Sequence, residues 1–100
     1  AAARAYFNCS TLVSVELEDE GGSGTANSHW ERRNNYEEMM SGVAGDIMKY
    51  SNLTLALLGD LGVYTPDFSL AEVPSFAKGL GCGFLNYKCL DANNPAQTSL

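Results

Sequence analysis

Residues 26–40 read ANSHWERRNNYEEMM and hold the only histidine and the only tryptophan of the chain, His29 and Trp30. The stretch ends in two methionines, Met39 and Met40, which follow the histidine by ten and eleven positions. One imidazole makes neither a catalytic triad nor a complete metal site, because a catalytic zinc takes three protein ligands and keeps one position open. Any such site must therefore take its other ligands from outside these residues.

Helix signals follow the histidine. Ser28 can cap a first helical turn, with Glu31 three positions later as the second half of a capping box. Good helix formers continue to Met40, and Gly42 interrupts them. We expect a short helix over residues 30–40, followed by a turn.

The segments before and after this stretch carry their own signals. Residues 1–7 are predicted to form a helix that stops near Asn8, and TLVSVELE (11–18) alternates in the manner of a short strand. EDEGGSGTANS (18–28) has the composition of an irregular loop. One or two helical turns are expected after Pro74.

The clearest helix signal is SNLTLALLGDLG, residues 51–62. Ser51 is a suitable N-cap, and Gly62 is a suitable C-terminal stop. Three leucines recur at i, i+4 and i+8 with further apolar residues between them, which predicts a largely buried helix.

Composition limits the class of protein. The chain has 100 residues, of which 45% are apolar and 18% are charged, and its formal net charge is -6. This apolar content is typical of one globular domain or part of one, and the negative charge opposes binding to nucleic acid. The sequence shows neither a bilayer-spanning apolar run nor a signal peptide. We expect an α+β fold that is mainly helical and irregular.

The three cysteines, Cys9, Cys82 and Cys89, are an odd number, so disulfides closed within the chain would leave one thiol over. The sequons NCS at Asn8 and NLT at Asn52 fit a secretory route and an oxidising compartment. A structural zinc held by the cysteines and the single histidine is an alternative. Its cysteine gaps of 72 and 6 intervening residues lack the usual closely spaced pair.

Each of these residue types also has an ordinary structural role. A lone histidine is usually hydrogen-bonded or on the surface, and adjacent methionines usually fill a core. Four acids stand before and within the loop and would form a solvated rim or at most a weak cation site: Glu16, Glu18, Asp19 and Glu20. The order in which the features occur is more informative than any one of them.

Six features follow one another along the chain: a glycine-rich loop, Ser-His-Trp-Glu, a methionine, a glycine-containing turn, an apolar helix and GCGFLNYKC (81–89). In this order they closely resemble the leishmanolysin (major surface protease) family of trypanosomatid zinc metalloproteases. FNCSTLVSVELEDEGGSGTANSHWE (7–31) looks like the family's segment leading to its third zinc ligand. LALLGDLGVYTPDFSLAEVPSFAKGLGCGFLNYKC (55–89) looks like the segment that follows its Met-turn, so the resemblance covers nearly the whole chain.

The resemblance implies the C-terminal part of a metzincin-like catalytic domain. In metzincins a helix bearing H-E-x-x-H supplies two histidines and a general-base glutamate, and a later histidine completes the zinc site above a methionine-bearing turn. By this resemblance His29 is the third ligand of one zinc ion, and Met40 is the Met-turn methionine. The glycines of the loop, Gly21, Gly22 and Gly24, would let the chain approach the metal closely.

The resemblance also assigns the cysteines. Cys9 and Cys82 match positions that pair in the family, and Cys89 would pair with a cysteine in a missing C-terminal domain. A bridge across this separation stabilises by about 4 kcal/mol in the chain-entropy model. Because Asn8 adjoins a cysteine that forms a bridge, Asn52 is the better glycosylation candidate.

No H-E-x-x-H motif occurs in residues 1–100. We therefore expect an inactive fragment of a longer protein, with residues 1–90 in the catalytic region and 91–100 as a polar tail leading to the missing domain. A non-catalytic surface adhesion paralogue of the same fold is one alternative. A small independent disulfide-bonded domain that binds a partner through its acidic rim is another, disfavoured because residues 8–28 would lack packing partners.

For the parent protein, the resemblance implies a zinc metalloendopeptidase that hydrolyses peptide bonds of protein and peptide substrates. It also implies a glycoprotein at the cell surface or outside the cell, with a role in adhesion to host surface or matrix proteins. Membrane attachment would come only through an anchor outside these residues.

Overall fold

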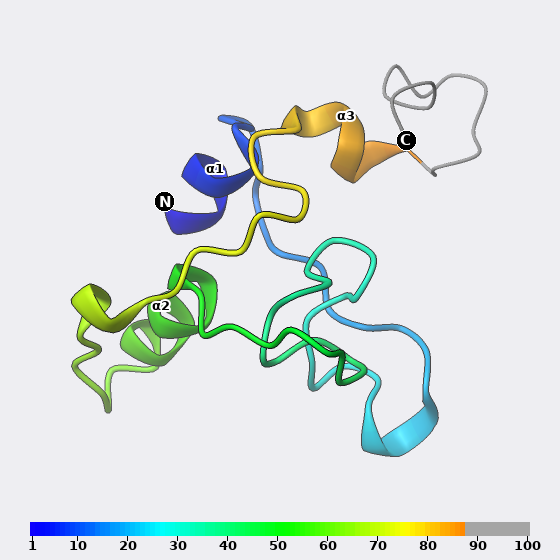
Figure 1. Cartoon of the computed structure of the whole chain (residues 1–100), viewed down its shortest axis with the longest axis horizontal. Helices are drawn as coiled ribbons and strands as arrows, with labels where there is room; N and C mark the ends of the chain where they lie inside the picture. The colour runs from blue at the N-terminus through cyan, green and yellow to red at the C-terminus, as the bar shows by residue number, and fades with distance from the viewer. Residues whose placement is uncertain (88–100) are drawn as a thin grey trace.

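A computed structural model describes residues 1–87 of the chain, and Figure 1 traces their course. The regular elements are short and are joined by long irregular segments. In chain order they are helix α1 (Ala2–Phe7), 3-10 turn η1 (Gly22–Gly24), helix α2 (Asn52–Asp60), 3-10 turn η2 (Phe68–Leu70) and helix α3 (Gly81–Asn86). Cys89 and the polar tail at 91–100 lie outside the described residues.

The predicted first helix is confirmed as α1. Asn8 ends it with a left-handed backbone conformation, φ 55°, and the next N–H, that of Cys9, donates to the carbonyl of Arg4 at 3.1 Å. Asparagine tolerates this conformation better than most residues, so the helix stops where the sequence predicts.

Helix α2 is also confirmed, with both of its predicted ends. The hydroxyl of Ser51 accepts from the N–H of Leu53 at 3.2 Å, and Gly62 has φ 75° just beyond the helix. The expectation of a largely buried helix is wrong in this structure, because Leu57 and Leu61 are 41% and 58% exposed. Only the first turn of α2 faces the core.

The helix predicted over residues 30–40 is wrong. This segment forms turns, because its N–H groups donate to other segments as well as within it: Trp30 to the carbonyl of Met40, and Met39 to that of Lys49. Isolated β-bridges reflect the same pairing, parallel between Trp30 and Ser41 and between Glu38 and Lys49. Long-range pairing thus overrides helix propensity here.

Two further expectations need correction. The strand predicted at 11–18 reduces to one antiparallel bridge, between Leu17 and Trp30. The chain after Pro74 forms hydrogen-bonded turns, and its helix starts only at Gly81. Ala77 has φ 62°, and positive φ values also occur at the glycines on either side of Leu80, which helical backbone does not allow.

The core lies between α1, the start of α2 and α3. Five buried residues form it: Phe7, Cys9, Leu53, Ala77 and Phe84. The loop residues Leu12 and Val15 pack against this core, so the expectation that residues 8–28 lack packing partners is wrong.

A disulfide joins Cys9, just after α1, to Cys82 in α3. The predicted pairing is therefore confirmed. It also excludes the alternative zinc site built on three cysteines, because two of the three thiols are already joined to each other.

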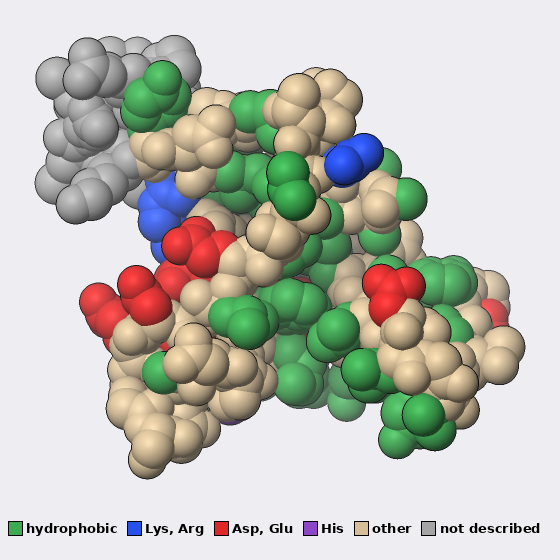
Figure 2. Space-filling model, turned by 180° about the vertical axis from the view of Figure 1, so that it is seen from behind, with side chains coloured by type: hydrophobic (Ala, Val, Ile, Leu, Met, Phe, Trp, Pro, Cys, Tyr) green, Lys and Arg blue, Asp and Glu red, His purple; other side chains and the backbone are tan. Residues whose placement is uncertain are grey.

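Much apolar surface remains exposed. Figure 2 shows hydrophobic side chains across the middle of one face, beside a group of acidic ones. Seven large aliphatic side chains are more than half exposed: Val13, Val43, Ile47, Leu61, Val63, Leu70 and Val73. Among residues 1–87, no helix has the length and apolar character needed to cross a membrane.

Candidate metal centre

The ring of His29 is held by one nitrogen. Its Nδ1 lies 3.0 Å from the carbonyl oxygen of Thr25 and 3.0 Å from the hydroxyl of Ser28. A carbonyl oxygen only accepts, and the Ser28 hydroxyl itself donates to the same carbonyl at 3.2 Å. These partners assign the proton of the neutral ring to Nδ1. The lone pair of Nε2 is then the atom that can bind a metal, as in many metal-ligating histidines.

The chain before the histidine folds back on itself. The N–H of Glu18 donates to the carbonyl of His29 at 2.9 Å, and the N–H of Asn27 donates to the carbonyl of Glu18 at 2.8 Å. Two residues after His29, the N–H of Glu31 donates to the carbonyl of Glu16 at 3.1 Å. These bonds close the glycine-rich loop and fix the backbone at His29.

Gly21 has a specific reason to be glycine. Its φ is 82°, and a Cβ there would lie 2.9 Å from the Cβ of Thr25, the residue whose carbonyl orients the histidine. Gly24 has nothing within 4 Å of the position that a Cβ would take, so that glycine meets no crowding of its own. Positive φ values therefore explain Gly21 and Gly22, whereas nothing in the described contacts requires glycine at position 24. Close approach of the loop to a metal stays a prediction.

Met40 lies beside the histidine segment. The N–H of Trp30 donates to the carbonyl of Met40 at 2.7 Å, and the N–H of Gly42 donates to the carbonyl of Trp30 at 3.1 Å. The structure thus brings together the two positions that the sequence singled out, His29 and Met40. The Met40 side chain is 37% exposed, and its role beneath a metal stays a prediction.

Glu38 is a buried acid that the sequence did not reveal. It is only 2% exposed, yet its carboxylate accepts four hydrogen bonds. Oε1 accepts from the N–H of Ser51 at 3.0 Å, from the Ser51 hydroxyl at 2.9 Å and from the Thr54 hydroxyl at 2.7 Å. Oε2 accepts from the N–H of Met40 at 2.7 Å. The carboxylate therefore joins the methionine turn to the start of α2.

The tryptophan beside the histidine belongs to the same network. Trp30 is buried, and its Nε1–H donates to the Thr54 hydroxyl at 3.0 Å, which in turn donates to Glu38. Nothing in the sequence alone indicates that Glu38 is buried. A helix over residues 30–40 would not predict the contacts with Ser51 and Thr54 that hold this carboxylate.

Glu18 was expected on a solvated rim, and that expectation is wrong. It is 6% exposed, and its carboxylate accepts from the N–H of Glu20 at 3.1 Å and from that of Arg32 at 3.3 Å. It packs so closely on Gly42 that a Cβ there would lie 2.5 Å from Oε2. Asp19 remains exposed, as expected.

Three carboxylates still lie close together. One oxygen from each of Glu18, Asp19 and Glu31 lies within 4.8 Å of the others. Burial raises the pKa of Glu31, the N–H of Arg33 opposes this, and the negative charges of Glu18, Glu16 and Asp19 raise the pKa further. The group is a site of mutual repulsion, and nothing in it points to a particular ligand.

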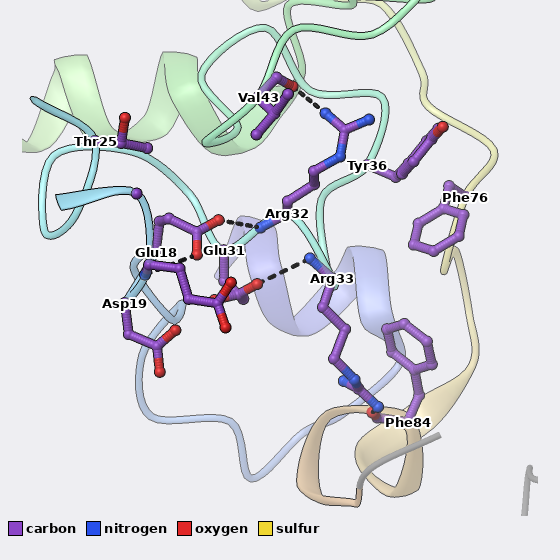
Figure 3. A pocket seen from close by; sticks show the side chains of 12 residues that line it. Glu18, Asp19, Thr25, Glu31, Arg32, Arg33, Tyr36, Val43, Phe76 and Phe84 are labelled. Atoms are coloured by element: carbon purple, nitrogen blue, oxygen red, sulfur yellow. Dashed lines mark hydrogen bonds between the residues drawn. The ribbon is translucent and has the colours of Figure 1, made fainter. Parts of the chain in front are cut away.

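These acids line one wall of an open cavity of about 810 Å³, shown in Figure 3. The opposite wall is aromatic and includes Tyr36, Phe76 and Phe84. Two arginines stack on this wall: the guanidinium carbon of Arg32 lies 4.4 Å from the Tyr36 ring centre, and that of Arg33 lies 4.8 Å from the Phe84 ring centre. His29 is not among the lining residues, so the cavity and the candidate metal ligand are separate features.

The asparagines of both sequons, Asn8 and Asn52, are exposed. Asn8 follows α1 and Asn52 begins α2, so either side chain can be reached from solvent. Glycosylation at these positions stays a prediction.

Comparison with known proteins identifies the family to which the chain belongs. The sequence model of the leishmanolysin family of peptidases, M8, matches residues 1–98. The chain is 45% identical over 93 residues to a leishmanolysin homolog of Crithidia fasciculata and 45% identical over 93 residues to leishmanolysin of Leishmania chagasi. These matches cover 93% of this chain and 14% and 15% of the two relatives.

A leishmanolysin-like peptidase of Drosophila melanogaster is 46% identical over 88 residues, which is 88% of this chain and 13% of that protein. The chain therefore spans about one seventh of the length of these relatives. Because the family model covers almost every residue, the resemblance noted from the sequence is confirmed, and the chain belongs to the leishmanolysin family of peptidases.

Proposed function

We propose that this chain is part of a zinc metalloendopeptidase and that His29 supplies one of its three metal ligands through Nε2. Family membership supports the peptidase class. The observation that carries the assignment is the bond between Nδ1 of His29 and the carbonyl of Thr25, because it leaves Nε2 as the unprotonated nitrogen.

The described residues fit one corner of a zinc site. A zinc ion, when bound by three neutral imidazoles, polarises a peptide carbonyl and lowers the pKa of a bound water toward neutrality. Within this chain, Thr25 and Ser28 orient the His29 ring, and the segment from Met40 to Gly42 braces the backbone that follows it. His29 is the only histidine of the sequence, so two ligands and the general-base glutamate have to come from outside residues 1–100.

We also propose that residues 1–100 alone do not hydrolyse peptides, since they lack the H-E-x-x-H motif. For the complete protein we propose protein and peptide substrates, a position at the cell surface or outside the cell, and a role in adhesion to host surface or matrix proteins. The disulfide and the two exposed sequons are consistent with an oxidising, extracellular environment. Attachment to a membrane would use an anchor outside this chain.

The test uses the complete protein and the substitution His29→Ala. Wild type is expected to retain about one zinc per molecule after gel filtration, measured by atomic absorption, since a site of this class binds a single ion. His29→Ala should lose the zinc and the hydrolysis of a quenched fluorescent peptide, while the melting temperature of the metal-free protein stays unchanged. Ser23→Ala, an exposed change in the same loop, is the matched control and should keep both.

Two outcomes would contradict the proposal. Unchanged zinc content in His29→Ala would show that this ring is not a ligand. A wild-type protein with neither zinc nor hydrolysis would support the non-catalytic adhesion paralogue instead, and reading the upstream sequence for H-E-x-x-H would then settle which form it is.

A further inference from the structure

We propose that Glu38 is a positioning residue for the metal ligand: its buried carboxylate holds the methionine turn and Trp30 in one arrangement and so fixes the backbone of His29. This inference rests on the proposed function only in its last step, from the backbone of His29 to the metal. The first steps concern contacts within the chain.

The carboxylate is fully committed to its partners. Glu38 is 2% exposed, and all four donors that reach it are neutral groups. Hydrogen bonds to a charged acceptor are shorter and stronger than neutral ones, and removing one partner inside a buried network leaves the others unsatisfied. A change at this side chain is therefore transmitted to the groups it contacts.

The two oxygens act on different segments. Oε1 takes all three donors from α2 and its N-cap, those of Ser51 and Thr54. Oε2 takes only the N–H of Met40, at 2.7 Å. One side chain therefore connects a helix end to the methionine turn, and the two connections can be altered separately.

Glu38 reaches Trp30 by two routes. Through the backbone, Oε2 binds the N–H of Met40, and the carbonyl of Met40 accepts from the N–H of Trp30 at 2.7 Å. Through side chains, Oε1 binds the Thr54 hydroxyl, which accepts from the indole N–H of Trp30 at 3.0 Å. Both the backbone and the ring of Trp30 are thus fixed, and Trp30 directly follows His29.

A residue held at both its backbone and its side chain leaves its neighbour little freedom. The carbonyl of His29 is bound by the N–H of Glu18, and its Nδ1 is bound by the carbonyl of Thr25. Glu38 supplies the bracing on the other side of the histidine. Outer partners of metal ligands commonly change metal affinity by about 10- to 100-fold when they are removed.

The test is Glu38→Gln in the complete protein. The amide keeps the size of the side chain, and its single oxygen can still serve Ser51 and Thr54. Its NH₂ group then faces the N–H of Met40, so two donors meet and the link to the methionine turn is lost. The substitution therefore separates the two connections of Glu38.

Peptide-resolved hydrogen exchange of the metal-free protein is the first measurement. We expect exchange at least tenfold faster in peptides covering residues 28–42, with α2 unchanged. Zinc affinity, from competition with a chelator, is the second measurement. We expect it to fall, by less than the about 10- to 100-fold seen when a group bonded directly to a metal ligand is removed, because Glu38 acts through Trp30.

Glu37→Gln is the matched control. This neighbouring carboxylate accepts from the N–H groups of Ser75 and Phe76 and makes no hydrogen bond with Trp30 among residues 1–87. It should leave zinc affinity unchanged and speed exchange in residues 28–42 much less than Glu38→Gln does, because its hydrogen bonds hold residues 75 and 76 and not the Met40 N–H. Thr54→Val removes only the side-chain route and should give a smaller change in the same direction, which keeps the proposal testable if Glu38→Gln fails to fold.

Unchanged exchange in residues 28–42 of Glu38→Gln would overturn the inference. So would faster exchange with unchanged zinc affinity, since the bracing would then not reach the ligand, and so would an equal effect of Glu37→Gln, which would indicate general destabilisation. If wild type binds no zinc, the proposed function fails, and the exchange measurement still decides whether Glu38 fixes the His29 backbone.

Discussion

The backbone N–H of Trp30 donates to the carbonyl oxygen of Met40 at 2.7 Å. The residue after the only histidine is therefore paired with the methionine eleven positions after that histidine. The bond from Gly42 back to Trp30 makes this pairing a parallel bridge, which restrains the loop and the turn together. A change in the methionine turn is thus expected to reach the histidine through the backbone and not only through side-chain packing.

Gly42→Ala should destabilise the complete protein. The new Cβ would lie 2.5 Å from Oε2 and 2.8 Å from Cγ of Glu18, whose buried carboxylate is held by two backbone N–H groups. Overpacking of this kind costs about 1–3 kcal/mol, measurable as a lower midpoint in urea unfolding. Gly24→Ala has nothing within 4 Å and serves as the control. Equal losses in both variants would show that the contact with Glu18 does not set the requirement for glycine.

Met40→Leu should be tolerated. The side chain is 37% exposed, and the pairing with Trp30 uses only backbone atoms, so the exchange keeps both the volume and the hydrogen bonds. The expected cost in unfolding free energy is below about 1.5 kcal/mol, and the complete protein should keep its zinc. Loss of all zinc in this variant would show that the methionine side chain has a role that packing alone does not explain.

Local signals in the sequence predicted the elements that depend on local interactions. Helix α1 ends at Asn8 and α2 starts at Ser51, because a left-handed asparagine and a capping hydroxyl act within a few residues of their own positions. Family resemblance supplied the Cys9–Cys82 pairing, which no local signal gives.

The segment at 30–40 shows why the rest was not predictable. Its residues favour a helix, but some of its N–H groups donate to other segments, that of Glu31 to the carbonyl of Glu16 and that of Met39 to the carbonyl of Lys49. The burial of Glu18 and Glu38 has the same origin, because each carboxylate accepts a hydrogen bond from a segment that is distant in sequence, Glu18 from Arg32 and Glu38 from Ser51. A lone sequence shows the donors and the acceptors but not which of them meet.

Tyr6→Phe should change the response to alkaline pH. The Tyr6 hydroxyl donates to the carbonyls of Pro74, at 3.3 Å, and of Phe76. Burial, and then the negative charge of Glu37, raise the pKa of Tyr6 to about 12. The pKa of Tyr6 in the folded protein lies above the ordinary value of about 10. The stability that the protonated hydroxyl contributes is therefore complete below about pH 10 and is lost as the pH rises toward 12.

The phenylalanine variant should lose about 0.5–1.5 kcal/mol at neutral pH, the net worth of a hydrogen bond. Its unfolding free energy should then fall less steeply than that of wild type between about pH 10 and 12, as measured by urea titration at several pH values. Parallel curves for the two proteins would indicate that Tyr6 does not titrate in this range.

Glu37→Gln should change the response to acid. Burial on its own would raise the pKa of Glu37, but the N–H groups of Phe76 and Ser75 and the Ser75 hydroxyl outweigh it and lower the pKa. The stability from this ionised carboxylate is therefore present above the ordinary pKa of about 4.3 and is lost as the pH falls through the lower folded value. Acid unfolding followed by tryptophan fluorescence should be less steep in the variant, and identical acid midpoints and slopes would contradict the assignment.

Glu31→Gln should act in the opposite direction. Burial is the largest cause that raises the pKa of Glu31 in the folded protein, and the negative charges of Glu18, Glu16 and Asp19 raise it further. The hydrogen bond from the N–H of Arg33 lowers the pKa but does not outweigh them. A raised pKa favours the protonated form of the carboxyl. The stability that protonated Glu31 contributes is therefore complete below about pH 4.3 and is lost as the pH rises through the pKa of the folded protein. At neutral pH the ionised Glu31 then opposes folding. In the wild-type chain the Arg33 N–H donates to Oε1 of Glu31 at 3.0 Å. A glutamine keeps an oxygen for this bond and removes the repulsion from the neighbouring carboxylates.

We therefore expect Glu31→Gln to raise the urea midpoint at pH 7 and to have no advantage near pH 4, whereas Glu37→Gln should lower the midpoint at pH 7. The two substitutions make the same chemical change, so their opposite signs isolate the surroundings of each carboxylate. Added salt should reduce the gain in Glu31→Gln, because the repulsion among partly exposed acids is screened. A gain of equal size at pH 4 and pH 7 would exclude charge repulsion as its cause.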